Sequence, residues 1–280
     1  MKFFSTPIKV LCASLFLGIA GCSSDTVEER SAFLEPNYAI HLPEGEGPFP
    51  TVLLFHGCGG LVGENGPKQI MDRYAKAAND VGYAAIVVDS FGPREISFDR
   101  AVRRVCSGLQ LRGARRAGDV IASLAFAETQ DFAKPDAFVL AGWSHGGWSV
   151  MEAMIMDLSD TWAPGLRAPS PKIYDQVHGV YLTYPYCGFP SRARKRGWAK
   201  PIPTQIIEAG QDVVAKEGPC HEAFDRMTES GVPVNLITFE EATHAFDEED
   251  QVEGAVSVYN PDLTDQALKL FQDFLINTDA

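Results

Sequence analysis

The chain has 280 residues, of which 45% are hydrophobic and 22% are charged. These values are ordinary for a folded protein and allow one sizeable core, so a disordered chain is not expected. The formal net charge of −13 argues against binding to nucleic acid and against electrostatic attraction to anionic lipid. We attribute the acidity to solubility and infer no cationic substrate from it.

The N-terminus has the features of an export signal. A short polar start with Lys2 and Lys9 leads into an apolar run over 10–20, which is too short to span a bilayer comfortably. The run ends in Ile19-Ala20-Gly21-Cys22 and resembles a bacterial lipoprotein signal. The resemblance implies cleavage after residue 21, a lipid on Cys22 and, because residue 23 is Ser rather than Asp, anchoring in the outer membrane. The domain would then face the periplasm or the cell exterior. An ordinary secretory signal that contains a cysteine is the alternative.

Polar and acidic residues fill the segment that follows this signal. We expect residues 22–36 to form a lipidated tether, because few of them are apolar enough to pack against a core. Residues 37–280 are expected to form a single domain. No internal repeat or low-complexity tract divides it.

Short apolar runs alternate with helical patterns along this domain. Unbroken runs of Val, Ile and Leu suit strands that are covered on both faces. The expected strands are 51–55, 84–88, 137–141, 177–182, 204–207 and 234–239, and the expected helices are 68–80, 114–127, 146–156, 217–230 and 263–276. Repeated strand–helix order predicts an α/β fold with a mostly parallel central sheet and helices on both faces.

The segment Gly142-Trp143-Ser144-His145-Gly146 follows a predicted strand and precedes a predicted helix. In that context G-x-S-x-G indicates a nucleophile elbow, in which the serine sits on a tight and strained turn. Glycines two residues before and after the serine remove side chains that would collide in the turn. We therefore predict that Ser144 is a nucleophile at the carboxyl edge of the sheet, beside the N-terminus of a helix.

A catalytic serine needs a base and an acid that orients this base. His244 follows the last predicted strand through a short loop, and Asp212 follows the strand over 204–207, so both are expected at the same edge as Ser144. We predict these three residues as a catalytic triad. Two rival acids remain: Glu208 falls too early, inside or ending its strand, and Asp247 belongs to an acidic run that we expect to be solvated.

Backbone N–H groups are expected to hold the oxyanion that such a serine generates. One donor should be the amide of His145, directly after the nucleophile. The other should come from the loop over 56–60, whose sequence is His-Gly-Cys-Gly-Gly. We predict the amide of Cys58, with Gly59 as the second choice, and we expect His56 to brace this loop by hydrogen bonding.

Six segments together resemble a known family, the dienelactone hydrolase-like branch of the α/β-hydrolase fold. They are spread along most of the mature domain: 56–60 (HGCGG), 89–94 (DSFGPR), 142–147 (GWSHGG), 184–188 (YPYCG), 210–212 (GQD) and 243–246 (THAF). The resemblance implies an enzyme that cleaves a small-molecule ester. True dienelactone hydrolases look like enzymes that use a cysteine as the nucleophile, whereas this chain has Ser144 at that position. The difference favours a general carboxylic ester hydrolase over an enzyme that cleaves dienelactone. The same triad can cleave a peptide, a thioester or a polyester, and a catalytically idle binding lipoprotein is a further alternative.

Aromatic residues near the nucleophile are candidates for the substrate pocket. We predict Trp143, which flanks Ser144, together with Tyr184 and Tyr186. No metal-binding or phosphate-binding motif is recognised, so neither a metal nor another cofactor is expected.

The mature chain keeps four cysteines, an even number that is typical of an oxidising compartment. Four cysteines allow three pairings, and the sequence does not choose among them. We favour Cys58 with Cys106 and Cys187 with Cys220, because each pair would join neighbouring loops in the expected fold. Free buried thiols, above all at Cys58, are the alternative.

Two charged features have less specific interpretations. The basic run over 192–196 could recognise an acidic ester or a headgroup, and we favour a solvated loop. Asp89 and Arg94 are expected to form a structural ion pair at the edge of the sheet.

Overall fold

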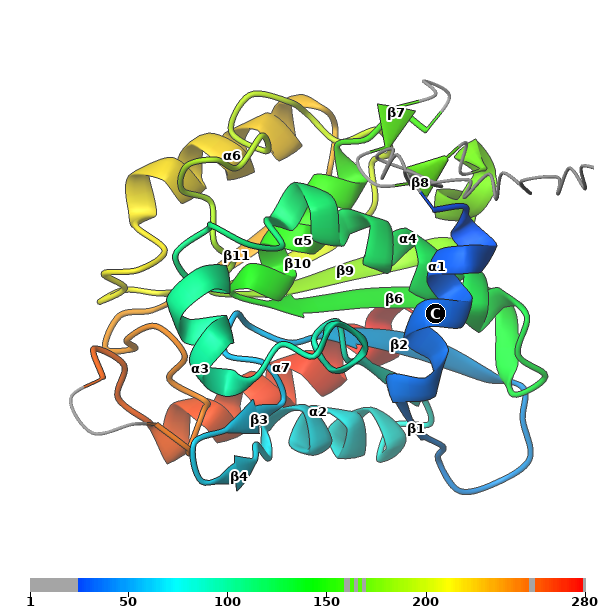
Figure 1. Cartoon of the computed structure of the whole chain (residues 1–280), viewed down its shortest axis with the longest axis horizontal. Coiled ribbons are helices and arrows are strands. Elements are labelled where there is room, and N and C mark those ends of the chain that lie inside the picture. Colours follow the sequence, from blue (N-terminus) through cyan, green and yellow to red (C-terminus); the bar gives the residue numbers. More distant parts are fainter. Residues whose placement is uncertain (1–24, 159–161, 164–165, 168–169, 252–254, 279–280) are drawn as a thin grey trace, which may run out of the picture.

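A seven-stranded sheet of order β1-β5-β2-β6-β9-β10-β11 forms the centre of the molecule (Figure 1). The computed structural model describes residues 25–158, 162–163, 166–167, 170–251 and 255–278. β1 pairs with β5 in the antiparallel sense, and the other neighbours in the sheet are parallel. The strands are β1 (Tyr38–His41), β2 (Phe49–Phe55), β5 (Ala84–Val88), β6 (Ala133–Trp143), β9 (Val177–Thr183), β10 (Thr204–Ala209) and β11 (Val234–Phe239).

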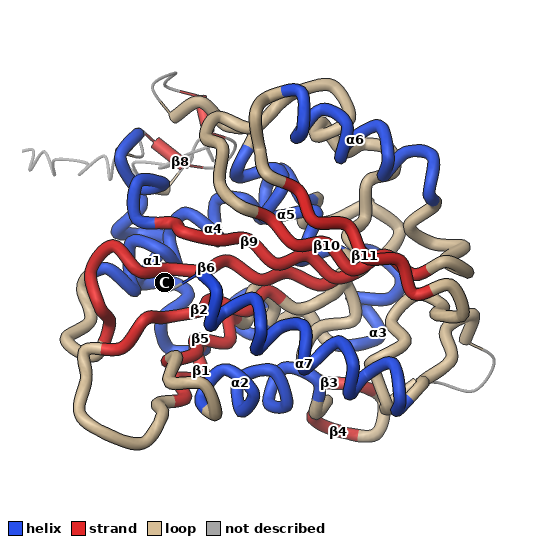
Figure 2. Tube along the Cα trace, turned by 180° about the vertical axis from the view of Figure 1, so that it is seen from behind, coloured by secondary structure: helices blue, strands red, loops and turns tan. Residues whose placement is uncertain are grey.

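Helices cover both faces of this sheet (Figures 1 and 2). Successive strand residues point to opposite faces, so Leu53 and Phe55 pack with α4 and α5 while Val52 and Leu54 pack with α2 and α7. The helices are α1 (Val27–Leu34), α2 (Ile70–Asn79), α3 (Phe98–Arg100), α4 (Gly113–Glu128), α5 (His145–Met154), α6 (Glu217–Glu229) and α7 (Pro261–Thr278). The predicted fold class, an α/β fold with a mostly parallel sheet between helices, is confirmed.

Short elements complete the described chain. The hairpins are β3 (Val62–Gly63) with β4 (Gly66–Pro67) and β7 (Trp162–Ala163) with β8 (Leu166–Arg167). Single turns of tighter helix lie at Glu35–Asn37, Gly92–Arg94 and Pro171–Gln176, and a wider π-helical turn spans Ala101–Val105. All six predicted strands are present. The edge strand β1 was outside the predicted runs, since it is paired on one side only and its side chains are half-buried or exposed.

Within the tether predicted over residues 22–36, the described residues 25–36 are instead part of the folded domain. Residues 22–24 lie outside the described residues, but α1 begins at Val27 and packs against α4. Thr26 caps α1, accepting from Glu29 N–H while the Glu29 carboxylate accepts from Thr26 N–H. Arg30 is buried and its guanidinium donates to Asp119 at 2.8 Å. The folded unit therefore includes residues from 25 onward, because the buried ion pair between Arg30 and Asp119 joins the polar helix α1 to the core.

We expect Arg30→Ala to lower the free energy of unfolding by about 1–3 kcal/mol, because the buried Asp119 carboxylate loses one of its donors. Arg167→Ala is the control, because Arg167 pairs with Glu29 at 3.3 Å where both side chains are exposed, and no measurable loss is expected. Urea denaturation of both variants measures the difference. Equal losses would contradict the docking of α1.

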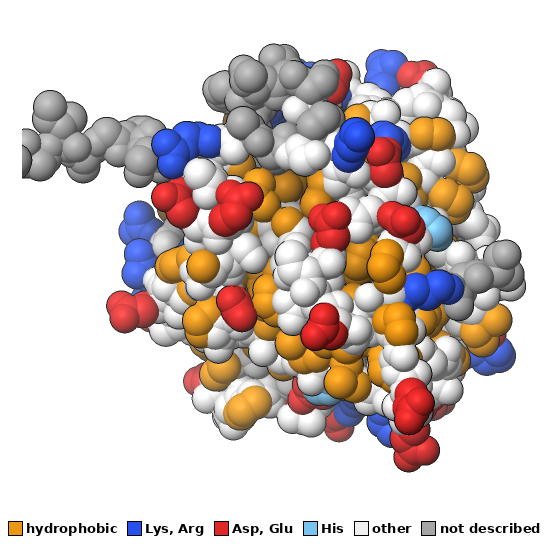
Figure 3. Space-filling view, turned by 90° about the vertical axis from the view of Figure 1, so that its right-hand side faces the viewer, with side chains coloured by type: hydrophobic (Ala, Val, Ile, Leu, Met, Phe, Trp, Pro, Cys, Tyr) orange, Lys and Arg blue, Asp and Glu red, His pale blue; other side chains and the backbone are white. Residues whose placement is uncertain are grey.

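The two predicted disulfides are confirmed. Cys58 is bonded to Cys106 and Cys187 to Cys220, so the alternative of a free thiol at Cys58 is wrong. On the face that lies to the right in Figure 1, acidic and basic side chains are dispersed among hydrophobic ones (Figure 3). Within the described ranges, no helix combines the length and the apolarity that crossing a bilayer requires.

Candidate active site

Ser144 lies on a sharp turn between β6 and α5. Its backbone has φ 49° and ψ −111°, a conformation that is strained for a residue with a side chain. A Cβ at Gly142 would lie 2.7 Å from backbone atoms of Gly146 and Gly147, and a Cβ at Gly146 would overlap the carbonyl oxygen of Phe55. The flanking glycines are therefore required by close backbone approach, as the sequence pattern predicted.

The structure brings Ser144, His244 and Asp212 together from three separate loops. His244 Nε2 lies 2.8 Å from Ser144 Oγ, and His244 Nδ1 lies 2.6 Å from Asp212 Oδ2. The other carboxylate oxygen of Asp212 accepts from the N–H groups of Val214 and Ala215, both at 2.7 Å. Because Asp212 accepts from Nδ1–H, Nε2 is left free to accept the serine proton.

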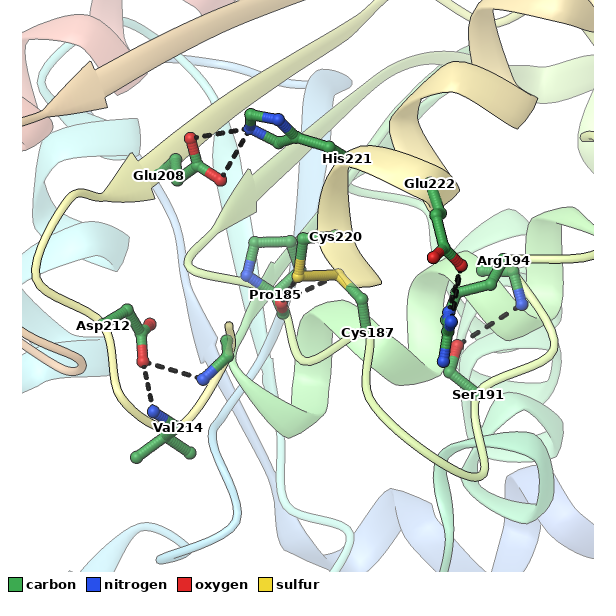
Figure 4. The surroundings of a disulfide bond; sticks show 12 residues. Pro185, Cys187, Ser191, Arg194, Glu208, Asp212, Val214, Cys220, His221 and Glu222 are labelled. Atoms are coloured by element: carbon green, nitrogen blue, oxygen red, sulfur yellow. Dashed lines mark hydrogen bonds and ion pairs between the residues drawn. A yellow bond between two sulfur atoms is a disulfide. The ribbon is translucent and has the colours of Figure 1, made fainter. Parts of the chain in front are cut away.

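The rival acid Glu208 lies inside β10 and contacts His221 and Thr238. Its carboxylate lies 3.2 Å from His221 Nε2 and accepts from the Thr238 hydroxyl at 3.2 Å. Figure 4 shows Glu208 directed toward His221, while Asp212 lies on the following loop beside Val214. Glu208 is therefore bound to His221 and Thr238, whereas Asp212 is the carboxylate that contacts His244.

The prediction that Asp247 is solvated is wrong. Its side chain is fully buried and accepts hydrogen bonds from the Tyr74 hydroxyl at 2.9 Å, from Trp143 Nε1 at 3.2 Å and from the Tyr184 hydroxyl. Burial raises the pKa of Asp247 to about 6, against the lowering effect of the two tyrosine hydrogen bonds. The Tyr184 ring packs at a tilt against the His244 ring, with 4.9 Å between the ring centroids, so this buried carboxylate supports the loop that carries His244.

Asp247 should make the protein less stable as pH rises from about 4 to about 6. Its folded-state pKa of about 6 lies above the unfolded value of about 3.9, so the folded chain binds the proton more tightly. We expect a loss of about 3 kcal/mol in the free energy of unfolding across this range, which Asp247→Asn should remove. Urea denaturation at a series of pH values measures both slopes. Parallel curves for the two proteins would contradict this prediction.

The loop after β2 lies directly against the nucleophile. A Cβ at Gly57 would lie 3.6 Å from Ser144 Cβ, and Cys58 borders the hollow beside Ser144. Among the described residues, no acceptor is found for the N–H groups of Cys58 and His145, the two predicted oxyanion donors. Gly59, the second choice, lies instead against Lys68.

Arg116 holds this loop in place, and sequence analysis did not identify it. The side chain is buried and donates to the His56 carbonyl at 2.7 Å, to Ser90 Oγ at 2.9 Å and to His145 Nδ1 at 3.2 Å. Burial lowers the pKa of Arg116 to about 10, which leaves it charged at neutral pH. His56 Nδ1 lies 2.7 Å from the Gly57 carbonyl, consistent with the predicted bracing role. Only the fold shows that a residue of α4 reaches both sides of the nucleophile.

The three predicted pocket residues have different positions. Tyr186 lines the hollow beside Ser144. Trp143 is fully buried against Tyr74 and Phe271 on the opposite face of the sheet, because neighbouring strand residues alternate between faces. Tyr184 is buried between Asp247 and the ring of His244. The predictions for Trp143 and Tyr184 are therefore wrong.

The charged features agree with expectation only in part: Lys195 and Arg196 are exposed, as expected for a solvated loop. Arg192 donates to the buried carboxylate of Glu152 at 2.7 Å, and Arg194 is paired with Glu222, so these members of the basic run are held by acidic partners. The predicted Asp89–Arg94 ion pair is not formed. Arg94 donates to Asp119 at 2.8 Å, while Asp89 accepts from the backbone N–H groups of the turn that follows it.

The described residues contain no group of three His, Cys, Asp or Glu side chains placed to hold a metal ion. The site therefore consists of a serine, an imidazole and a carboxylate at the carboxyl edge of a mostly parallel sheet. This arrangement, with the strained turn before α5, defines an α/β-hydrolase fold.

Solved structures of esterases share this fold. Esterase 2 of Thermogutta terrifontis, phosphoramylated by tabun, is 18% identical with a TM-score of 0.60, over 86% of this chain and 88% of that one. A dienelactone hydrolase-like promiscuous phosphotriesterase from metagenomic libraries is 15% identical with a TM-score of 0.63, over 86% and 92%. Est1E from Butyrivibrio proteoclasticus, with ferulic acid bound, is 15% identical with a TM-score of 0.57, over 86% and 94%. No family model matches the sequence, and neither does the sequence of any curated protein.

Proposed function

We propose that this protein is a serine hydrolase of carboxylic esters. The observation that carries the proposal is the continuous chain of hydrogen bonds from Ser144 Oγ through His244 to Asp212. A structural serine has no need of an imidazole that is itself oriented by a buried carboxylate. The fold shared with esterases and with a dienelactone hydrolase-like phosphotriesterase supports ester cleavage over the alternatives of peptide, thioester or polyester cleavage.

The proposed reaction has two halves. His244 Nε2 takes the proton of Ser144 as Oγ attacks the ester carbonyl, and the amides of Cys58 and His145 hold the resulting oxyanion. The imidazolium, stabilised by Asp212, gives this proton to the leaving alcohol as the acyl-enzyme forms. Water then attacks the acyl-enzyme and passes its proton through His244 back to Ser144, which releases the acid. No step requires a cofactor.

Hydrolysis of p-nitrophenyl butyrate by Ser144→Ala tests this function. We expect the variant to lose kcat by about 10³-fold or more while its circular dichroism is unchanged. Ser149→Ala is the matched control, because Ser149 is buried on the same helix but donates to the His145 carbonyl. Folded wild-type protein that hydrolyses no ester would favour the binding-lipoprotein alternative instead.

We further propose that the enzyme is attached to the bacterial envelope by a lipid on Cys22. The lipoprotein-like signal supports this, and two disulfides suit an oxidising compartment such as the periplasm or the cell exterior. Residues 1–24 lie outside the described residues. We expect Cys22→Ser to move the protein from the outer-membrane fraction to the soluble fraction. Unchanged fractionation would contradict the anchor.

A further inference from the structure

Two hollows lie beside Ser144 and the Cys58–Cys106 disulfide. The first has a volume of about 270 Å³ and the second about 170 Å³, and both are bordered by Cys58, Cys106 and Ser144. An ester that is attacked by Ser144 has two parts, the acid and the alcohol. Two hollows that share one nucleophile can therefore hold one part each.

The position of His244 decides which part enters which hollow. The leaving alcohol oxygen must come within hydrogen-bond reach of His244 Nε2, because this nitrogen supplies its proton. His244 borders the second hollow together with Ser144, whereas the first is bordered by His145 and not by His244. The alcohol part is therefore placed in the second hollow and the acyl part in the first.

Both hollows are bordered mainly by apolar groups, so they differ chiefly in volume. Apolar side chains dominate the first, and its charged neighbour Arg112 is engaged by the Gly108 carbonyl at 2.8 Å. The second is bordered by Phe98, Val102 and Ala245, and the ion pair between Lys68 and Glu248 at 2.5 Å also lies at its border. The apolar wall of the first hollow consists mainly of Val105, Leu109, Trp148, Tyr186, Phe189 and Val214.

The size of the first hollow limits its occupant. A dry apolar cavity of about 150 Å³ holds a benzene molecule. A hollow of about 270 Å³ therefore has room for an aromatic ring with several further carbons, or for a medium-length alkyl chain. Leu109 and Phe189, at the rim, are 67% and 85% exposed, so an apolar group that enters also covers apolar surface there.

We propose that the substrates are esters of a bulky apolar acid, aromatic or of medium chain length, in which the alcohol is the smaller part. This inference rests on the proposed function, because it assigns the two sides of the same nucleophile. Burial of the acyl chain lowers the free energy of the transition state as well as that of the bound ester. Selectivity between acids is therefore expected in kcat/KM.

Two ester series test the proposal, each with one half held constant. Along ethyl acetate, ethyl hexanoate and ethyl cinnamate, we expect kcat/KM to rise by about tenfold or more, since each buried methylene is worth up to about fourfold. Along ethyl, butyl and decyl hexanoate, we expect kcat/KM to rise less and to reach its maximum before decyl, because the second hollow is the smaller one. A rise that follows the alcohol and not the acid would overturn the proposal, and so would flat values in both series.

Two exposed positions on one segment give a matched pair of variants. Leu109 borders the first hollow and Val102 the second, and they are 67% and 46% exposed. Leu109→Trp should reduce the preference for ethyl cinnamate over ethyl acetate by about fivefold or more, while Val102→Trp leaves it within about twofold. The reverse result would place the acyl group in the second hollow.

Labelling with a small fluorophosphonate distinguishes a failure of the proposed acyl preference from a failure of the proposed serine hydrolase function. Wild-type protein that reacts with the probe but shows no preference for bulky acids would overturn this inference and leave the proposed function intact. Folded protein that neither reacts nor hydrolyses any ester would overturn both. Labelling together with the acyl preference supports both.

Discussion

Asp212→Asn is expected to lower kcat/KM for p-nitrophenyl butyrate by about 10⁴-fold without unfolding the protein. The Asn side-chain oxygen can still accept from the N–H groups of Val214 and Ala215, so the loop should keep its shape. Its NH₂ group then faces His244 Nδ1, which must become an acceptor. The proton therefore moves to Nε2, where it prevents this nitrogen from accepting the proton of Ser144.

Glu208→Gln is the control for this prediction, because Glu208 is a neighbouring carboxylate in β10, directly before the loop that carries Asp212. Because Glu208 is directed toward His221, we expect activity within about threefold of the wild type. Steady-state kinetics with circular dichroism on both variants measures the difference. Full activity in Asp212→Asn, or a larger loss in Glu208→Gln, would remove Asp212 from the proposed triad.

Gly146→Ala is expected to prevent folding, with a loss above about 4 kcal/mol in the free energy of unfolding. The added methyl would overlap the carbonyl oxygen of Phe55, which belongs to a central strand of the sheet. Neither backbone can move without breaking the pairing of β2 with β6 or the turn at Ser144. The gap between the nucleophile turn and the sheet that supports it is therefore too small for a single added methyl group.

Gly218→Ala provides the matched control. Gly218 lies in the first turn of α6 with no atom within 4 Å of its added Cβ, so this variant should be as stable as the wild type or slightly more stable. Soluble yield and urea denaturation measure both variants. A well-folded Gly146→Ala with wild-type stability would contradict the packing described for the elbow.

The sequence predicted what is set by local pattern and by strand order. Unbroken apolar runs identified six strands of the sheet. The glycine spacing around Ser144 identified the elbow because backbone contact at these positions leaves no room for a side chain. Since the carboxyl ends of parallel strands lie at one edge, the loops that carry Asp212 and His244 were expected beside Ser144, and the distances agree with that expectation.

The sequence failed where a residue's environment comes from distant elements. Asp247 stands in an acidic run, yet Tyr74 and Trp143, far apart in the chain, enclose it. Arg94 follows Asp89 closely, but Asp119 on α4 presents a buried carboxylate to it. The same carboxylate binds Arg30 and so orders a segment whose polar composition is typical of a tether.

Mass mapping of a fluorophosphonate adduct tests the central claim most directly. We predict a single adduct on the peptide that contains Ser144, formed quickly by the wild type and at least about 10³-fold more slowly by His244→Ala. An adduct on a different residue, or none on folded wild-type protein, would contradict the claim that Ser144 is the activated nucleophile.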